Sequence, residues 1–383
     1  MYPDRRTRLD ERRHPGRQLC ALLNCRYPIL QAGMGGVARS ELVTAVTIAG
    51  GYGTLGMVRE RPELISAEID AVRGRTDRGF GVNVIPAATD RHLLEEQLAV
   101  CFEKQVHSLS LFWDVDDGVV GQIKSHGLLV VHQVGSVAQA KEAARAGADV
   151  IVAQGFEAGG HVHGGVTSLT LLPQVVRAVD VPVVAAGGFA SGESLVAAWA
   201  LGAAGIQCGT AFLATHESFA HDYHKQRVVA ATEEDTVHTE VFAVNWPPHA
   251  PVRVLQNSVT QAKEDPMAAP PSPEPIAMDD GRPILRTSTD SPLRTTTGDL
   301  EALALYAGQV AGQLETLPSV QQRIDAILVA AEDTLDALQR ENQPSGQCSG
   351  AKPLEGHPGE TRAYASSPCY LHEFEEDPSE VDS

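Results

Sequence analysis

The chain has 383 residues, 43% of them hydrophobic, which is enough to bury the core of one large domain or two ordinary ones. Its 30 basic and 49 acidic residues give a net charge of −19, which would repel a nucleic-acid backbone. The Arg-rich start has no apolar signal-peptide core, and no later run approaches the ~20 apolar residues that cross a bilayer. We therefore expect neither nucleic acid nor a membrane as a partner.

The six cysteines are sparse and form no C-x-x-C pair, which favours a reducing, cytoplasmic setting over a disulfide scaffold. His, Asp and Glu residues show no metal-ligand spacing, and no Ser nucleophile elbow is present. The sequence thus predicts no metal site and gives no support to Ser-His-Asp chemistry.

From Tyr27 onward, short apolar runs alternate with amphipathic stretches, the pattern of strands that are each followed by a helix. Ser40 and Ser136 are predicted N-caps, and Gly147 is a predicted helix stop. Eight runs are predicted strands: 28–32, 52–57, 80–85, 107–113, 128–134, 150–153, 181–186 and 205–209. Eight strand-helix units predict a closed (β/α)8 TIM barrel rather than an open doubly wound sheet.

The strand-helix rhythm divides the chain into four parts. We expect a flexible arm at 1–18, the barrel at 19–213, a lid or helical segment packing on the barrel at 214–340, and a disordered acidic tail at 341–383.

The predicted lid segment is itself uneven. Residues 262–298 are rich in Pro, Ser and Asp without periodicity, so they are predicted to be a loop. Apolar spacing predicts helices at 299–314 and 320–338. The lid would therefore contain two helices after a long Pro-rich loop.

The stretch from Val150 to Gly165, VIVAQGFEAGGHVHGG, is a buried strand that runs into a Gly-rich loop carrying His161 and His163. Loops after the strands of parallel α/β folds hold the chemistry, so a titratable His here is a catalytic candidate. A His in such a loop can also be no more than a solvated or capping side chain. The nearby Glu157 is predicted to accept backbone N–H bonds.

Gly-rich turns follow three of the predicted strands: 33–36 after the first, Gly187-Gly188 after the seventh, and Gly209-Thr210 after the eighth. Barrels frequently bind a phosphate with the loops after strands seven and eight. These turns predict a phosphate site, but they do not establish that the phosphate belongs to a flavin.

Several segments together resemble the nitronate monooxygenase (2-nitropropane dioxygenase) family of FMN enzymes: YPILQAGMGGV, AGGYGTLG, FGVNV, VIVAQGFEAGGHVHGG, VPVVAAGGFASG and GIQCGTAFLATHES. The resemblance extends from about Leu19 to Leu338. It is less specific for the reaction, because FMN-dependent enoyl-[acyl-carrier-protein] reductases share the EAGGH loop and the AAGG and GT turns.

The resemblance implies an FMN across the barrel mouth. Its ring would be approached by the backbone of Met34 and Gly35, its pyrimidine edge bound by Asn83, its middle lined by Gln154, Gly155 and Gly159, and its phosphate held by Gly187, Gly188, Gly209 and Thr210.

His161 matches the family's catalytic His. As an imidazole it would take the α-proton of a nitroalkane, and as an imidazolium it would stabilise a bound nitronate; either role needs only its ordinary pKa range. Oxidation by dioxygen to a carbonyl compound and nitrite is the implied reaction. The alternatives are NAD(P)H-dependent reduction of an enoyl thioester or quinone, and, without flavin, an isomerase or lyase that binds a phosphate.

Three further residues are candidates for the substrate pocket. His132 points either into the barrel mouth or into packing, Trp113 roofs the pocket or belongs to the core, and His163 is an extra imidazole beside the expected single base. The expected partners are a small-molecule substrate and O2, and a homodimer remains open.

Overall fold

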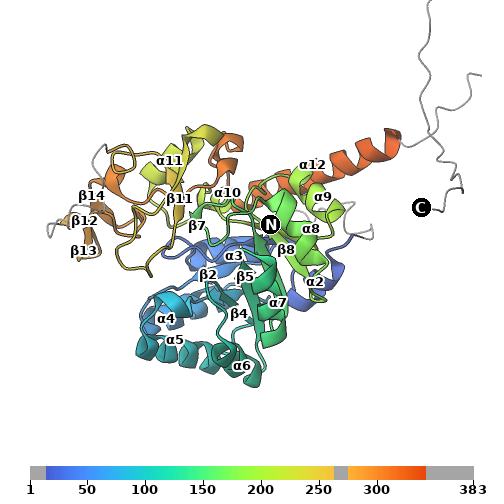
Figure 1. Ribbon diagram of the computed structural model, residues 1–383, viewed down its shortest axis with the longest axis horizontal. Helices are drawn as coiled ribbons and strands as arrows, with labels where there is room; N and C mark the ends of the chain where they lie inside the picture. The colour runs from blue at the N-terminus through green and yellow to red at the C-terminus, as the bar shows by residue number, and fades with distance from the viewer. Residues whose placement is uncertain (1–13, 263–274, 342–383) are drawn as a thin grey trace, which may run out of the picture. The chain divides into compact units, whose positions relative to one another are not determined.

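Eight short parallel strands form the centre of the fold. The computed structural model describes residues 14–262 and 275–341, and the residues up to Arg340 form one unit. The strands are β1 (Ile29–Gln31), β2 (Thr54–Gly56), β3 (Gly81–Asn83), β4 (Ser108–Leu111), β5 (Leu129–Val134), β6 (Val150–Gln154), β8 (Val183–Ala186) and β9 (Gly205–Cys208). Their order is β1-β9-β8-β6-β5-β4-β3-β2, and a parallel bridge between Leu30 and Tyr52 joins the two ends. The predicted TIM barrel is confirmed (Figure 1).

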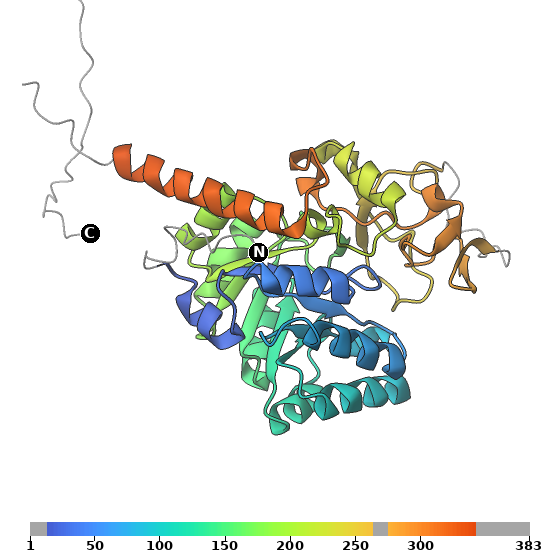
Figure 2. The ribbon, with the colours of Figure 1, turned by 180° about the vertical axis from the view of Figure 1, so that it is seen from behind.

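Helices cover the outside of this barrel. They are α3 (Ser40–Ile48), α4 (Pro62–Arg73), α5 (Arg91–Glu103), α6 (Asp117–Ser125), α7 (Val137–Ala146), α8 (Ser168–Val176) and α9 (Gly192–Ala200). After β9 comes only the short α10 (Thr210–Leu213), and the long α12 (Val320–Glu341) fills the eighth place on the barrel. Figure 2 shows α12 lying against the barrel. Its residues Ile324 and Ile327 join the same core as the barrel helices.

Side chains alternate between the two faces of each strand, so the strands separate an outer core beneath the helices from an inner core inside the barrel. On β5, Val130 and Val134 point outward to the helices, whereas Val131 points inward to Val150 and Val152 of β6. The helix α2 (Arg17–Leu23) adds Leu19 and Leu23 to this inner cluster. Apolar side chains thus fill the barrel interior.

A second region follows α10. It contains α11 (Asp222–Val229) and the 3-10 helices η2 (Glu233–Asp235), η3 (Leu300–Ala302) and η4 (Gln309–Gln313), and its strands pair with the two-residue β7 (Gly160–His161). A further 3-10 helix, η1 (Pro86–Ala88), follows β3. The strand β11 (Val252–Leu255) pairs antiparallel with both β7 and β10 (Thr236–Thr239). The β6–β8 connection is therefore tied to a segment about 90 residues later in the chain.

The expectation of a Pro-rich loop at 262–298 is wrong for its described part. Strands β12 (Pro275–Asp279), β13 (Arg282–Leu285) and β14 (Thr296–Gly298) form a separate antiparallel sheet. A tight turn at Asp280-Gly281, both with positive φ, closes the β12–β13 hairpin. The strands are short and their register shifts near Pro275, which hides the alternation that marks a strand. Residues 263–274 lie outside the described part.

The helix predicted at 299–314 is also wrong, whereas the one predicted at 320–338 is confirmed as α12. Between η3 and η4 the chain is extended beside β11, where the Leu255 N–H donates to the Leu305 carbonyl at 2.8 Å. This pairing replaces the helical hydrogen bonds that the apolar spacing favours.

The two predicted helix caps have different outcomes. The Ser136 hydroxyl accepts from the Gln139 N–H, and Gly147 ends that helix with φ 113°, as expected. Ser40 is not a cap, because the extended residue before α3 is Arg39. The predicted arm at 1–18 overlaps α2 at Arg17, and residues 1–13 and 342–383 lie outside the described part.

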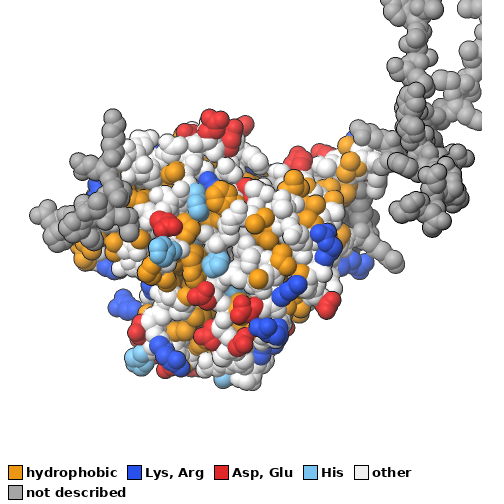
Figure 3. Space-filling view, in the orientation of Figure 1, with side chains coloured by type: hydrophobic (Ala, Val, Ile, Leu, Met, Phe, Trp, Pro, Cys, Tyr) orange, Lys and Arg blue, Asp and Glu red, His pale blue; other side chains and the backbone are white. Residues whose placement is uncertain are grey.

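In the described ranges, no helix combines the length and apolar character needed to span a membrane. The same ranges contain no group of three or more His, Cys, Asp or Glu side chains suited to a metal ion. Acidic and basic side chains are interspersed over the barrel helices on the face shown in Figure 3.

The contact between α9 and α12 gives a stability prediction. A Cβ on Gly192 would lie 2.1 Å from the Ala331 nitrogen and 2.3 Å from the Ile327 oxygen, which are backbone atoms of α12. We expect Gly192→Ala to lower the free energy of unfolding by about 1–3 kcal/mol, because α12 must shift. Urea unfolding measures this change.

The matched control is Gly121→Ala in the middle of α6, where nothing lies within 4 Å of the added Cβ. This change should raise stability by about 0.5–1 kcal/mol, because alanine loses less backbone entropy. A Gly192→Ala protein that unfolds at the wild-type urea concentration would contradict the packing of α12 described above.

Candidate functional site

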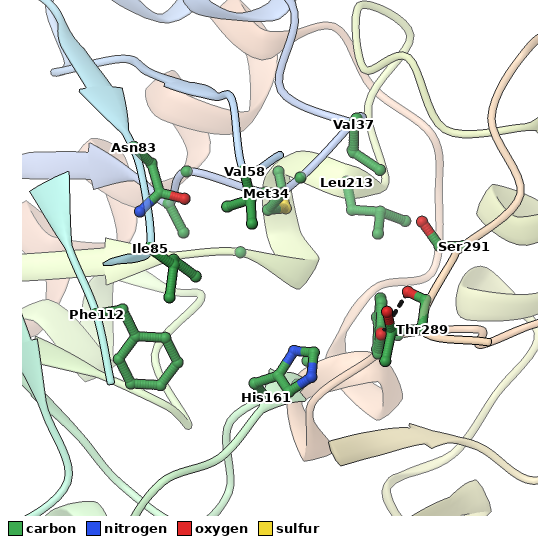
Figure 4. Close-up of a pocket in the computed structure, with 18 of the residues that line it drawn as sticks. Met34, Val37, Val58, Asn83, Ile85, Phe112, His161, Leu213, Thr289 and Ser291 are labelled. Carbon is green, nitrogen blue, oxygen red and sulfur yellow. Dashed lines mark hydrogen bonds between the residues drawn. The ribbon is translucent and has the colours of Figure 1, made fainter. Parts of the chain in front are cut away.

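A cavity of about 800 Å³ opens at the carboxyl ends of the barrel strands. It is lined on one side by the turns that follow these strands and on the other by residues 279–310 (Figure 4). The barrel therefore contributes one half of the cavity wall, and the region after α10 contributes the other.

The structure brings most of the predicted site residues together. The cavity is lined by Met34, Gly35, Asn83, Gln154, Gly159, His161, Gly187, Gly188, Gly209 and Thr210. These residues come from five different strand ends and from β7, so the convergence of their turns depends on closure of the barrel.

Gly155 is the exception among the predicted cofactor residues, because it does not line the cavity. An added Cβ there would lie 2.5 Å from the Ser168 nitrogen and 2.6 Å from a Glu157 carboxylate oxygen. That carboxylate accepts from the N–H and the hydroxyl of Ser168, both at 2.9 Å. Gly155 thus makes room for the structural bonds predicted for Glu157, at the start of α8.

Two lining glycines have open space where a side chain would stand. A Cβ on Gly209 would have only the Ala32 Cβ and the Met34 sulfur near it, both at 3.8 Å, and a Cβ on Gly35 only Val58 at 4.0 Å. Protein packing alone does not require glycine at these two positions. A ligand that lies against the backbone explains both glycines.

Asn83 leaves an acceptor in the cavity. Its amide nitrogen donates to the Ser110 carbonyl at 3.0 Å, while its buried Oδ1 has no partner. Figure 4 shows this side chain pointing toward the cavity from β3. A buried oxygen without a donor favours a ligand N–H, such as that of a flavin pyrimidine edge. Together with the open glycines, this oxygen shows that the site fits the expected flavin.

Deeper in the barrel, two glutamines missed by the sequence reasoning also line the cavity. The Gln207 amide donates to Gln133 Oε1 at 2.8 Å, so each side chain fixes the other across the barrel. Both residues occupy inward positions on β9 and β5, a pattern that the strand alternation could have revealed.

His161 is held by its main chain. It pairs with Val252 of β11, and the Gln154 side chain donates to the His161 carbonyl at 2.9 Å. The imidazole points into the cavity in Figure 4, and its buried Nε2 has no hydrogen-bond partner. A ring nitrogen without a partner is free to exchange a proton with a ligand.

The prediction that His161 keeps its ordinary pKa is wrong. Burial, and then the positive charge of Arg59, lower the pKa of His161 to about 3. The ring is therefore neutral near pH 7 in this structure, and the predicted imidazolium role does not apply to it.

Trp246 is the principal site residue that the sequence reasoning missed. Its indole stacks on the His161 imidazole with ring centroids 3.6 Å apart and planes 18° apart, and it lines the cavity. The segment after residue 214 has no strand-helix rhythm, so no sequence signal placed this side chain. A tryptophan in a segment that could not be placed is the only hint the sequence contains.

The three substrate-pocket candidates do not line the cavity. His132 alternates with the inward Val131 and Gln133 on β5, so its ring lies on the outer side of the barrel wall. Trp113 packs with Phe112 and Ile85, which is the core role weighed above.

His163 lies behind the cavity wall. Its ring centroid is 4.5 Å from that of Trp113, and its Nε2 is 3.1 Å from the Gln139 amide nitrogen. These contacts make His163 a packed loop residue rather than a second group facing the cavity.

Charged groups surround the outer part of the cavity. They include Arg59 and the ion pair between Arg282 and Asp290 at 2.9 Å. Tyr306 also lines this part and donates to the Thr289 carbonyl at 2.7 Å. Arg59, Arg282 and Asp290 carry no motif, because they come from segments brought together only by the fold.

A family model described as nitronate monooxygenase matches residues 17–330. A protein of Rhodococcus jostii (strain RHA1), named (3aS,4S,5R,7aS)-5-hydroxy-7a-methyl-1-oxo-octahydro-1H-indene-4-carboxyl-CoA dehydrogenase, is 33% identical over 84% of this chain and 97% of its own length. A Staphylococcus haemolyticus (strain JCSC1435) protein named "Probable nitronate monooxygenase" is 34% identical over 59% of this chain and 75% of its own.

Two solved structures are similar along most of the chain. FabK from Thermotoga maritima has a TM-score of 0.73 and 30% identity, covering 86% of this chain and 99% of its own. Nitroalkane oxidase from Streptomyces ansochromogenes has a TM-score of 0.69 and 28% identity, covering 84% and 99%.

The bonds of Gln154 give a second prediction. We expect Gln154→Met to lower the free energy of unfolding by about 1–3 kcal/mol, because the partly buried His161 carbonyl loses its donor. Gln174→Met is the control: this exposed amide donates only within its own helix, and the change should stay within about 0.5 kcal/mol. Urea unfolding compares the two, and equal effects would contradict the role given to Gln154.

Proposed function

Because this chain belongs to the nitronate monooxygenase family, we propose that it oxidises alkyl nitronates, and nitroalkanes through their α-carbon, to carbonyl compounds and nitrite with O2. It is a flavin-dependent oxidoreductase, in line with relatives named as oxidoreductases. The observation that carries the proposal is the His161 imidazole, which lines the cavity and whose buried Nε2 has no protein partner.

We further propose that the flavin is FMN. Asn83 would bind the pyrimidine edge, Met34 and Gly35 would lie against the ring, and Gly187, Gly188, Gly209 and Thr210 would hold the phosphate. Bound FMN would supply the electron acceptor of the reaction. The open space at Gly35 and Gly209 and the unpaired oxygen of Asn83 support this assignment.

His161 supplies the proton chemistry in this proposal. A neutral imidazole accepts the α-proton of a nitroalkane at Nε2, whereas a nitronate has already lost that proton and needs no base. Gln154 keeps the His161 backbone in place during this transfer, and Trp246 shields the ring from water. The rest of the cavity would position the substrate.

A second candidate is a flavin enzyme that acts on a thioester, as the name of the Rhodococcus jostii relative suggests. The observation that favours it is the reach of the cavity beyond the proposed flavin site to Arg59, Arg61 and Arg282. Such cations suit the phosphates of a coenzyme A. The NAD(P)H-dependent reduction of an enoyl thioester, the alternative raised in the sequence analysis, is one form of this second candidate.

Anaerobic mixing separates the two candidates. Rapid bleaching of the flavin by NAD(P)H favours the thioester reductase. A flavin that NAD(P)H leaves oxidised, together with release of nitrite from propionate 3-nitronate in air, supports nitronate oxidation.

The cofactor assignment predicts the behaviour of a glycine variant. Purified protein should show flavin absorbance, and Gly209→Val should weaken FMN binding at least about tenfold, because its side chain enters the proposed phosphate site. Fluorescence titration of flavin-free protein measures this affinity. Gly165→Ala, whose Cβ meets nothing within 4 Å, should bind FMN like the wild type. Equal FMN affinity of Gly209→Val and wild type would contradict the site.

The role of His161 gives a further prediction. His161→Asn should reduce nitroalkane turnover by about 10²–10⁴-fold and spare nitronate oxidation, because only the first needs a base. Nitrite release from each substrate measures this split. Equal losses with both substrates would show that His161 is not the base.

The low pKa of His161 sets the pH dependence. The neutral form is the base, and a pKa of about 3 keeps it neutral as pH falls from 8 to 5. Nitroalkane turnover should therefore stay level over this range. A histidine with its ordinary pKa would instead lose about tenfold by pH 5.5.

A further inference from the structure

Three side chains from distant parts of the chain form a row beside the cavity. The Arg59 guanidinium carbon lies 5.8 Å from the Trp246 ring centroid, and the indole stacks on the His161 imidazole at 3.6 Å. All three residues line the cavity. The indole is thus in contact range of both the cation and the imidazole.

Arg59 fastens the segment that carries Trp246. Its guanidinium donates to the carbonyl of Asn245, which is the residue before Trp246. It also donates to the Thr289 hydroxyl at 3.3 Å. Two different nitrogens of the planar fork make these two bonds, a geometry that the single nitrogen of a lysine does not reproduce. Arg59 therefore links the turn after β2 to two segments of the opposite cavity wall.

Backbone strain at Arg59 indicates that the contacts hold this link in place. Arg59 has φ 58°, in the left-handed region that asparagine, such as Asn245 with φ 72°, adopts more readily. This region costs a residue such as arginine about 1–2 kcal/mol. The surrounding contacts must outweigh that cost, and such strain clusters at ligand sites.

The stack decides what His161 can do. Trp246 covers one face of the imidazole, and neither the indole Nε1 nor the imidazole Nε2 has a hydrogen bond to hold its ring. Tyr306 is 5.9 Å away between ring centroids, too far to fix the orientation. The contact with the indole is therefore the closest restraint on the imidazole plane.

We infer that Arg59 is a positioning residue for His161: by fastening the Trp246 segment, it holds the indole against the imidazole and keeps Nε2 directed into the cavity. The inference rests on the proposed function in taking His161 as the reacting group. Arg59 does not itself exchange the proton.

The charged and titratable groups around His161 come from every neighbouring segment. They are Arg59 from the turn after β2, Asp290 beside Arg282, Tyr306 before η4, His163 beyond β7, Glu157 in the loop before β7, and Arg253 on β11. Of these, Arg59 is the one whose charge lowers the pKa of His161, so a titration reports its loss.

The test is an NMR titration of histidine ring signals in the flavin-containing protein without substrate, with His161→Asn to assign the signal. In the wild type, the His161 signal should not titrate between pH 5 and 8. In Arg59→Met and in Trp246→Leu, water reaches the ring, and the pKa should rise by about two units or more, which brings the His161 titration into this pH range. Trp246→Phe, which keeps an aromatic face, should stay near the wild type.

Arg59→Lys separates positioning from charge. It keeps the cation but replaces the two nitrogens that bind Asn245 and Thr289 with one nitrogen on a different stem, so the inference predicts a rise in the His161 pKa here as well. If the His161 pKa is unchanged in Arg59→Lys but raised in Arg59→Met, the charge of residue 59 alone sets this pKa, and the inference is overturned. Arg61→Met removes another cavity cation and should leave the titration unchanged.

Folding is checked by near-ultraviolet circular dichroism. If the Arg59 variants fold poorly, Trp246→Leu decides the question, and an unchanged His161 titration in that variant overturns the inference. Because no substrate is used, this result is independent of whether the protein oxidises nitronates.

Discussion

The antiparallel pairing of β7 with β11 is the interaction on which the site depends. Two residues of β7, Gly160 and His161, pair with Arg253 and Val252. Without this pairing the β6–β8 connection would be a long glycine-rich loop with no fixed place for its histidine. With it, the imidazole is carried on a strand whose partner belongs to the region after α10.

Other contacts reinforce the same connection. The buried Arg253 donates to the Phe156 carbonyl at 3.0 Å and lies over the Phe156 ring. A Cβ on Gly159 would lie 2.4 Å from the Gly308 nitrogen, so the segments around these two glycines touch through their backbones. A loop that appears flexible from its glycines is thus fixed from three directions, and its glycines serve close packing as well as ligand approach.

The consequence is electrostatic as well as geometric. Burial beneath Trp246 removes water from His161, and no carboxylate bonds the ring to restore a positive charge. The imidazole therefore stays neutral, which suits proton acceptance and not the binding of an anion by charge. An arrangement that orders the ring also sets its protonation state.

Much of the barrel and of its side of the cavity could be predicted from the sequence, because each barrel element has a recognisable local sequence pattern. Each strand is an apolar run, each helix is amphipathic, and the turns that reach the cavity are marked by glycine pairs such as Gly187-Gly188. Gly155 shows the limit of that signal, since glycine also accommodates packing against Ser168. His132 and Trp113 show another limit: a residue at a strand end faces the cavity or the helix layer according to register, which a one-residue change reverses.

The second wall of the cavity could not be predicted, because it rests on contacts between segments far apart in the chain. Trp246 and Asp290 carry no motif, and the strands β12 to β14 are too short and irregular for their alternation to be read. The neutrality of His161 depends on Arg59 and Trp246, which are far from it in the sequence. Its lowered pKa could therefore not be predicted from the sequence either.

The most direct test of this account is a crystal structure of the protein with its bound flavin. The account predicts the flavin ring between Asn83 and His161, with Nε2 of His161 facing the open side of the ring and the phosphate between the turns at Gly187-Gly188 and Gly209-Thr210. A flavin bound elsewhere, or an imidazole turned away from the ring into the Trp113 cluster, would contradict it.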